Sequence, residues 1–406
     1  MKQSTISQDR EEMKRSLKFF LPLAACLILA NIYYAQPILT DIAASIGLAS
    51  TSSGMIMTML QLGYVLGIVF LVPLGDVLEN RRLVAFMVIG ASAALLMAAW
   101  SDGVIGFLTA SLFIGMCSVA MQVIVPFAMG LATAGERGKV LGLIIAGALL
   151  GVVLSRPASS LITSVAGWQP VYLIAAFFML VVGVALFRVL PHTTPNAKGL
   201  SYLGILGSMV KLLGNVPLLP LRLALTGIIF LGFSMFWATA PIVLRGDLNF
   251  SHSQIALFSL ASLVTPPCAI VAGKLIDRGY GNIMIFAATA LIAAAYLVTA
   301  FFGMYAVAFV FAVFMLDPGM NMSTMSIQQK VLTLVPEARS RLNAINVAAN
   351  FTGGAIGSAL GPWMFSHFGW QAVAGVGADL MVIPFTINLV LTGFRRSALP
   401  KLADRA

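Results

Sequence analysis

Two ionisable side chains lie deep inside long apolar stretches of this sequence. Arg156 follows Lys139 by seventeen residues, which is about 25 Å along a helix at about 1.5 Å per residue. Asp317 stands in the stretch FMLDPGMNMS, directly before Pro318. An ionisable group at membrane depth costs at least about 2.5 kcal/mol and by default indicates a functional site. These two residues are therefore candidates for binding a charged group or for carrying a proton.

The acid and the guanidinium together suit proton coupling. Burial favours the neutral form of a carboxylic acid and a nearby cation favours its charged form, so such a group can release and rebind a proton. We interpret Asp317 as the proton-coupling residue and Arg156 as its partner or as the counter-ion of an acidic substrate. The alternative for Asp317 is a structural cap of the kink at Pro318. Asp379, in the last apolar stretch, is expected to be structural.

The composition defines the elements that must position these residues. The chain has 406 residues, of which 60% are hydrophobic and 9% charged, whereas a soluble protein carries about 25% charged residues. Twelve helices of about 20 residues need about 240 apolar positions, close to what the chain supplies. The sequence therefore predicts an all-α membrane protein with twelve transmembrane helices. They are expected to start near Phe19, Met55, Leu83, Ile105, Val140, Val171, Leu221, Ser253, Ile283, Tyr305, Leu342 and Val373.

The cations predict orientation. A net charge of +10 suggests nucleic acid in a soluble protein, but here the cations stand in short loops, so we expect a lipid bilayer and no nucleic acid. With the N-terminus in the cytoplasm, all but two of the 24 Lys and Arg residues fall in cytoplasmic segments, the exceptions being Arg156 and Arg245. The positive-inside rule thus predicts a multi-pass protein of the bacterial inner membrane with both termini cytoplasmic. The first apolar stretch is expected to be retained rather than cleaved.

The sequence lacks the motifs of nucleotide-binding proteins, zinc proteins and serine hydrolases. A nucleotide-binding loop, clustered zinc ligands and a serine triad are missing from the sequence, and its three histidines are scattered. The three cysteines lie in apolar stretches, where free cysteine serves as a small apolar residue. We therefore expect no enzyme, no catalytic residues, no metal and no cofactor.

The two halves of the chain resemble each other at an offset of about 200 residues. The segment from Arg137 aligns with the segment from Arg339, and YYAQPI from Tyr33 aligns with WATAPI from Trp237. The matched pairs are Gly151 with Gly353, Gly167 with Gly369, and Trp168 with Trp370. The repeat predicts two pseudo-symmetric six-helix bundles with a site between them. We assign residues 1–189 to an N-terminal bundle, 190–220 to a cytoplasmic linker holding a short interfacial helix, and 221–406 to a C-terminal bundle.

Two loops at equivalent places in the halves carry a family motif. PLGDVLENRR follows the second stretch and GKLIDRGYGN follows the eighth, and both resemble the G-x-x-x-D-R-x-G-R-R signature of the major facilitator superfamily. The resemblance covers essentially the whole chain, although Val77 stands where arginine is expected. It implies conformational-switch residues, with a charge cluster that only fixes topology as the alternative. The switch residues are Asp76, Arg81, Arg82, Gly273, Asp277 and Arg278.

The family resemblance also implies which residues line a central cavity. The stretch around Arg156 and Pro157 is similar to the glycine-proline motif of antiporter members, with Arg156 where glycine is expected. In the family, the first, fourth, seventh and tenth helices line the cavity. Their polar and aromatic residues here are Asn31, Tyr33, Tyr34, Gln36, Gln122, Ser234, Trp237, Asp317 and Asn321. Asn343, Asn346 and Asn350 form one polar face of the eleventh stretch, which either lines the pathway or bonds a neighbouring helix.

These residues suit a moderately hydrophobic organic substrate, because the predicted cavity walls are soft and amphipathic. The resemblance is strongest to proton-coupled drug and metabolite exporters of the arabinose-efflux-permease-like group. We therefore expect a monomeric secondary transporter that exports a small molecule by alternating access, with protons as the coupling ion. One alternative is uptake of a small organic anion with Arg156 as counter-ion. More remote alternatives are a non-transporting membrane sensor and an intramembrane enzyme.

Overall fold

The computed structural model describes residues 15–133, 135–192 and 201–403, and side chains from residue 17 to residue 393 within these ranges. Residues 193–200 of the predicted linker lie outside the described residues. The described chain is helical and contains no strand, so the prediction of an all-α protein is confirmed.

The helices follow the expected apolar stretches closely. In the first half they are α1 (Arg15–Ala30), α2 (Leu39–Ile46), α3 (Met55–Phe70), α4 (Asn80–Ala99), α5 (Val104–Ser118), α6 (Ala120–Leu131), α7 (Arg137–Ala166) and α8 (Gln169–Val189). Within the predicted linker the structure has the helix α9 (Tyr202–Asn215). In the second half they are α10 (Leu219–Gly246), α11 (His252–Ser259), α12 (Thr265–Leu275), α13 (Gly281–Phe302), α14 (Ala306–Leu332), α15 (Arg339–Leu380) and α16 (Val382–Ala403).

Nine helical ranges within the described residues are long and apolar enough to cross a membrane. Two of them, His252–Phe302 with 51 residues and Pro336–Gly393 with 58, each hold enough residues for two crossings of about 20 residues. The shorter apolar helix Leu17–Ala30 adds to these ranges. The chain is thus a multi-pass membrane protein, and the count of twelve helices stays a prediction.

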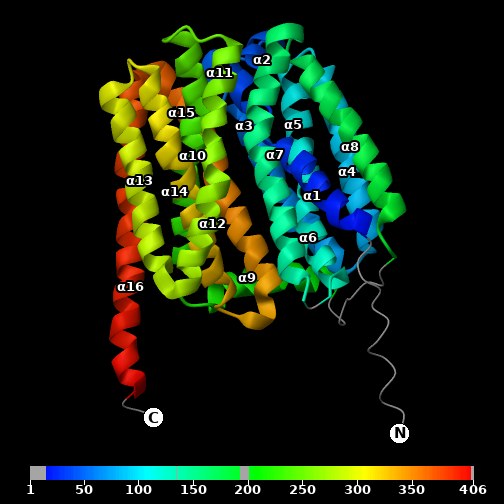
Figure 1. The fold of residues 1–406 in the computed structure, drawn as a ribbon, viewed down its shortest axis with the longest axis vertical. Helices are drawn as coiled ribbons and strands as arrows, with labels where there is room; N and C mark the ends of the chain where they lie inside the picture. The colour runs from blue at the N-terminus through cyan, green and yellow to red at the C-terminus, as the bar shows by residue number, and fades with distance from the viewer. Residues whose placement is uncertain (1–14, 134, 193–200, 404–406) are drawn as a thin grey trace.

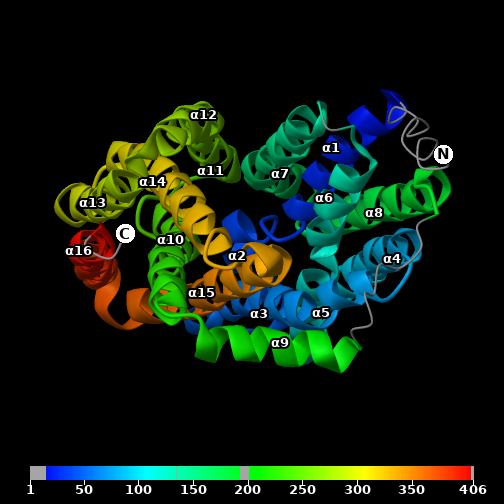
Figure 2. The same cartoon turned by 90° about the horizontal axis from the view of Figure 1, so that it is seen from below.

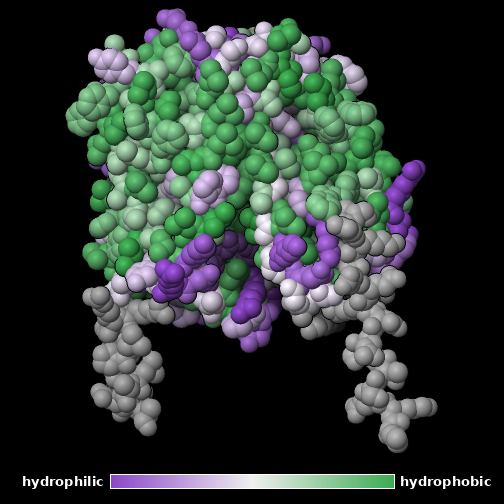
Figure 3. Space-filling view, viewed as in Figure 1, coloured by the Kyte–Doolittle hydropathy of each residue, from purple (hydrophilic) through white to green (hydrophobic). Residues whose placement is uncertain are grey.

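The helices form two groups side by side (Figure 1). Helices α1–α8 lie on one side and α10–α16 on the other, while α9 lies across the end of the molecule (Figure 2). We name the end of the molecule where α1 begins, α16 ends and α9 lies the terminal face. The opposite end, where α2 lies, is the far face. Apolar side chains cover the flank between these two faces (Figure 3). The domain boundaries themselves stay a prediction.

The internal repeat is visible in the backbone. Gly167 has φ 83° and ψ 178°, and its counterpart Gly369 has φ 75° and ψ 178°, a conformation that favours glycine. Helix α7 packs on α1 as α15 packs on α10. A Cβ atom added at Gly151 would overlap the backbone of α1, and one added at Gly353 would overlap the backbone of α10. The same close helix contacts therefore occur twice, as small residues allow in membrane helices.

Candidate functional site

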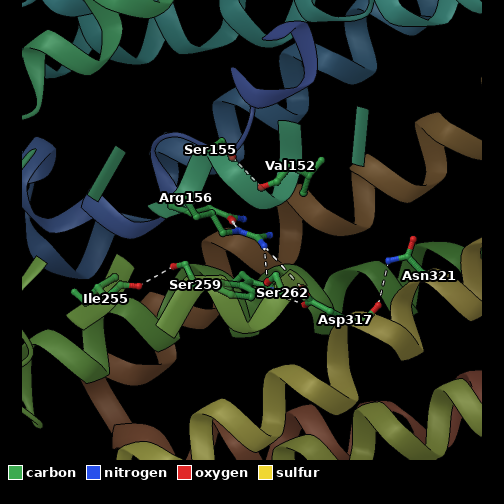
Figure 4. A network of polar contacts seen from close by, with 10 residues as sticks. Val152, Ser155, Arg156, Ile255, Ser259, Ser262, Asp317 and Asn321 are labelled. Atoms are coloured by element: carbon green, nitrogen blue, oxygen red, sulfur yellow. Dashed lines mark hydrogen bonds and ion pairs between the residues drawn. The ribbon is translucent and has the colours of Figure 1, made fainter. Parts of the chain in front are cut away.

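Arg156 lies at the centre of a polar network between the two groups of helices. Its side chain is 1% exposed, and its Nε donates a hydrogen bond of 2.7 Å to Gln36 Oε1. Its Nη1 donates to Ser262 Oγ at 3.3 Å, as Figure 4 shows. The guanidinium carbon lies 3.8 Å from the centroid of the Trp237 ring. Helix α7 is thus joined to both halves through one buried cation.

Asp317 completes the network from α14. Its side chain is 5% exposed, and Oδ1 accepts a hydrogen bond of 2.9 Å from Trp237 Nε1. Its Oδ2 lies 4.0 Å from Arg156 Nη1, which is longer than a hydrogen bond. Trp237 therefore contacts both charged groups. Its indole N–H donates to the carboxylate of Asp317, and its ring stacks against the guanidinium of Arg156.

The helices that supply these side chains are irregular where they do so. After α1 the chain forms a turn and a short 3-10 helix, Gln36–Ile38, which contains Pro37. Ser262 lies in another 3-10 segment, Leu260–Val264, just before two prolines. Proline removes a backbone donor and breaks regular helix geometry. Pro157 and Pro318 likewise follow Arg156 and Asp317, so the sequence places its helix breakers around the network.

A cavity of ≈ 650 Å³ extends from the terminal face toward this network. It is lined by α1, α3, α6 and α7 of the first half and by α14 and α15 of the second, and Figure 3 shows the molecule hollowed between its halves at this end. Four neutral side chains cross it as a chain that we name the amide belt: Tyr64, Gln122, Gln328 and Asn343. Gln122 Nε2 donates to Tyr64 Oη at 3.2 Å, Asn343 Nδ2 to Gln122 Oε1 at 3.5 Å, and Gln328 Nε2 to Asn343 Oδ1 at 2.6 Å.

The far face is closed by a second polar cluster. Arg245 Nη2 donates to Asp41 Oδ1 at 3.1 Å, and His252 Nε2 lies 3.5 Å from the same oxygen. Ser160 Oγ of α7 donates to the main-chain oxygen of His252 at 2.7 Å. Each of these contacts joins the first half to the second. The cavity is therefore open at the terminal face and closed, first by the Arg156 network and then by this cluster, toward the far face.

The structure brings together five of the residues that the sequence singled out. Arg156, Asp317, Gln36 and Trp237 are bonded or stacked as above, and the Tyr33 ring centroid lies 5.3 Å from the guanidinium carbon. The other predicted cavity residues lie apart from this cluster. Gln122 belongs to the amide belt, Ser234 accepts a hydrogen bond from Gln61, and Asn321 donates one to the main chain of Asp317. Tyr34 is half-buried. Asn31 is buried, and its side chain has no hydrogen-bond partner among the described residues.

Sequence reasoning missed several residues of this arrangement. Ser262, Tyr64 and Gln328 were not singled out, although each lies in an apolar stretch that was expected to be helical. The far-face partners Arg245 and His252 were also missed as a cluster. For Ser262 a usable signal was its position four residues before the Pro266–Pro267 pair, where a helix must break.

The predicted switch residues lie at the terminal face, and their role stays a prediction. Asp76 is exposed and lines a recess of ≈ 320 Å³ together with Arg341 of the second half. Arg82 Nε lies 2.9 Å from Glu79 Oε2, and the Arg81 guanidinium lies 4.6 Å from the Phe187 ring centroid. In the second half Gly273 lies near the end of α12 and is partly buried, and Asp277 and Arg278 follow α12 and are exposed.

Comparison with known proteins gives consistent matches over the whole chain. The family model of the Major Facilitator Superfamily matches residues 21–226 and 222–404. A "Putative uncharacterized transporter YgaY" of Escherichia coli is 32% identical over 394 residues, covering 96% of this chain and 99% of the relative. A "Probable sugar efflux transporter" of Helicobacter pylori is 22% identical, covering 93% and 96%. A crystal structure of a mutant of the nucleoside transporter NupG matches with a TM-score of 0.76 at 12% identity, covering 92% of this chain and 99% of that one, which shows a shared fold.

Proposed function

Because the chain belongs to the major facilitator superfamily, we propose that it exports a small organic molecule in exchange for protons, by alternating access. As a member of this family with bacterial relatives, it is a non-enzymatic multi-pass transport protein of the bacterial inner membrane. Four further points belong to the proposal: the kind of substrate, the coupling ion, the direction of transport and the monomeric state.

One observation carries the proposal: the cavity ends at a network built from both halves. Arg156 of α7 contacts residues of α10, α14 and the segment after α11, and the segment after α1, which accepts a hydrogen bond from Arg156, packs against α10. A transporter that alternates must exchange the contacts that close one face for those that close the other. The Arg156 network supplies contacts that hold the far face closed and that must separate when it opens.

The position of Asp317 in this network supports proton exchange. Protonation of its carboxylate removes the negative charge that lies 4.0 Å from the Arg156 guanidinium, so it weakens one contact between the halves. A proton that enters when the far face is open and leaves when the terminal face is open would drive substrate in the opposite direction. The inward proton gradient of a bacterial cell then favours export.

The orientation and the direction have separate support. The terminal face is taken as cytoplasmic because all but two of the 24 Lys and Arg residues fall on that side of the predicted topology. Export is supported by the printed name of the Helicobacter relative, a probable sugar efflux transporter. The cavity faces the cytoplasm in this assignment, ready to accept a substrate for export.

The experiment compares Asp317→Asn with Asp379→Asn in vesicles that contain a pH-sensitive dye. Asp379 is the matched control, because it is an exposed carboxylate of α15. With an imposed pH gradient and a panel of neutral, anionic and cationic compounds, wild type and Asp379→Asn should show substrate-dependent proton movement. Asp317→Asn should lose this movement and keep counterflow of part of the compound panel. Full gradient-driven accumulation by Asp317→Asn would leave Asp317 as a structural partner of the Pro318 kink.

A further inference from the structure

The network contains buried donors without an acceptor. Arg156 Nη2 and Gln36 Nε2 have no hydrogen-bond partner among the described residues, although both residues are only 1% exposed. The two side chains are already joined by the bond from Arg156 Nε to Gln36 Oε1, so both donors belong to one place. Buried donors in native proteins are normally paired, and an orphaned one requires an explanation. An acceptor atom of a bound ligand is such an explanation.

The charges of the network, in contrast, are already matched. It holds one cation, Arg156, and one anion, Asp317, and its other members are the neutral Tyr33, Gln36, Trp237 and Ser262. Toward the far face, the charged residues Asp41 and Arg245 pair with each other beside His252. Adding a charged ligand would therefore leave an uncompensated charge in a buried site, which proteins avoid.

Two helices connect the cavity to this place. On α7, Ile145 and Ala148 line the cavity. Arg156 lies eleven residues after Ile145 and eight after Ala148, and these spacings place it on the same face of the helix. On α14, Gln328 lines the cavity, and Asp317 precedes it by eleven residues. Eight residues of helix span about 12 Å. The network therefore lies beyond the closed end of the cavity, on the route that a substrate would follow through the molecule.

The walls along this route are also nearly uncharged. The cavity is lined by apolar side chains and by the amide belt, whose amide groups both donate and accept hydrogen bonds. Arg339, at the start of α15, is the charged residue of the lining. Such walls select for shape and hydrogen bonding rather than for charge.

We infer that the transported substrate is an uncharged organic molecule with an oxygen acceptor, which binds Arg156 Nη2 and Gln36 Nε2 while Asp317 keeps its negative charge. The inference rests on the proposed transport function and names the substrate class of that site. It also gives a reason for exchange. When Asp317 takes up a proton, Arg156 loses its counter-charge, so the buried site is no longer neutral and releases the substrate as it hydrates. A carboxylate, in contrast, would bind only together with a proton on Asp317.

The test measures thermal stabilisation of the purified full-length protein by matched compounds. The first set of probes is 4-hydroxybenzamide, 4-hydroxybenzoate and 4-hydroxybenzylamine. The second set is hexanamide, hexanoate and hexylamine. Wild type should bind the amides about a hundredfold more tightly than the acids, since the acids bring an uncompensated charge. Arg156→Gln should lose about tenfold or more of amide binding, the size expected for a lost bond to a buried charged donor.

Asp317→Asn gives the sharper outcome. Its amide side chain leaves Arg156 without a counter-charge, so the preference should reverse and the acids should bind more tightly than the amides. Acids preferred by wild type would overturn the inference in favour of an anion carrier, and so would equal binding of the three classes or no stabilisation by any amide. Amide binding without proton movement in the vesicle experiment would retain the substrate class and reject proton exchange.

Discussion

Replacing Arg156 by glutamine should shift the protein toward the state that is open at the far face. The change removes the guanidinium from the Trp237 ring, 3.8 Å away, and a desolvated cation–π contact contributes about 2 kcal/mol. It also removes the bond from Nη1 to Ser262 Oγ, and a typical hydrogen bond contributes about 1 kcal/mol. Both contacts join the two halves. Their sum of about 3 kcal/mol corresponds to roughly a hundredfold change in the equilibrium between the two states.

Arg245→Gln provides the matched control, because it removes a second arginine whose side chain contacts the opposite half. Its pair with Asp41 is partly solvated, with side chains 34% and 21% exposed. Ion pairs of this kind contribute about 1 kcal/mol or less. The same assay should therefore show a shift of about fivefold at most.

The assay is a spin-label distance measurement across the far face. Labels are placed at Asp102→Cys, in the exposed link after α4, and at Tyr305→Cys, in the exposed link before α14. The three native cysteines are first replaced by serine. Arg156→Gln should populate a longer distance than wild type. An unchanged distribution, or a larger shift in Arg245→Gln, would refute the view that the buried network holds this face closed. Trp237→Leu removes the same stacked ring and should shift the distances in the same direction.

Two further predictions concern packing and topology. Gly353→Val should lower the melting temperature by an amount equivalent to about 1–3 kcal/mol or more, the cost of overpacking, because a Cβ atom there overlaps the backbone of α10. Gly375→Ala should not destabilise the protein, because a Cβ atom at that position meets open space. A thermal melt in detergent compares the two. Cysteine probes at Asp102 should react with an impermeant reagent from outside the cell and a probe at Lys198, which lies outside the described residues, should not. External labelling at Lys198 would contradict the predicted orientation.

The sequence was most informative where a residue type is costly at its depth. Arg156 and Asp317 were identified because a charge inside an apolar stretch requires a reason, and Gln36 and Trp237 because they are polar or amphipathic on stretches that the family resemblance assigns to the cavity. The structure joins these four residues in one network. Helix positions were predicted for the same physical reason, since hydropathy alone defines most apolar stretches.

Residues whose types are ordinary at their positions could not be identified in this way. Ser262 is a small residue in an apolar stretch, where serine commonly bonds its own backbone, and its contact with Arg156 depends on the 3-10 segment that turns it. Tyr64 reads as packing until α6 and α15 are placed beside it. Asp41 and Arg245 lie at helix ends, where charged residues are expected, and they are 204 positions apart in the chain. Each of these contacts depends on tertiary packing that the local pattern does not contain.

The internal repeat explains why the network has one cation and not two. The alignment that starts at Arg137 and Arg339 places Ser358 at the position of Arg156. Arg156 of α7 contacts Ser262 across one interface between the halves, and Ser358 of α15 contacts Gln61 of α3 across the other. Both interfaces are polar, but only the first carries a charge among these contacts, and the aligned aromatic residues Tyr33 and Trp237 both lie near it. A symmetric scaffold with its charge on one interface can respond to a proton by loosening that interface alone, which is the asymmetry that proton-driven exchange requires.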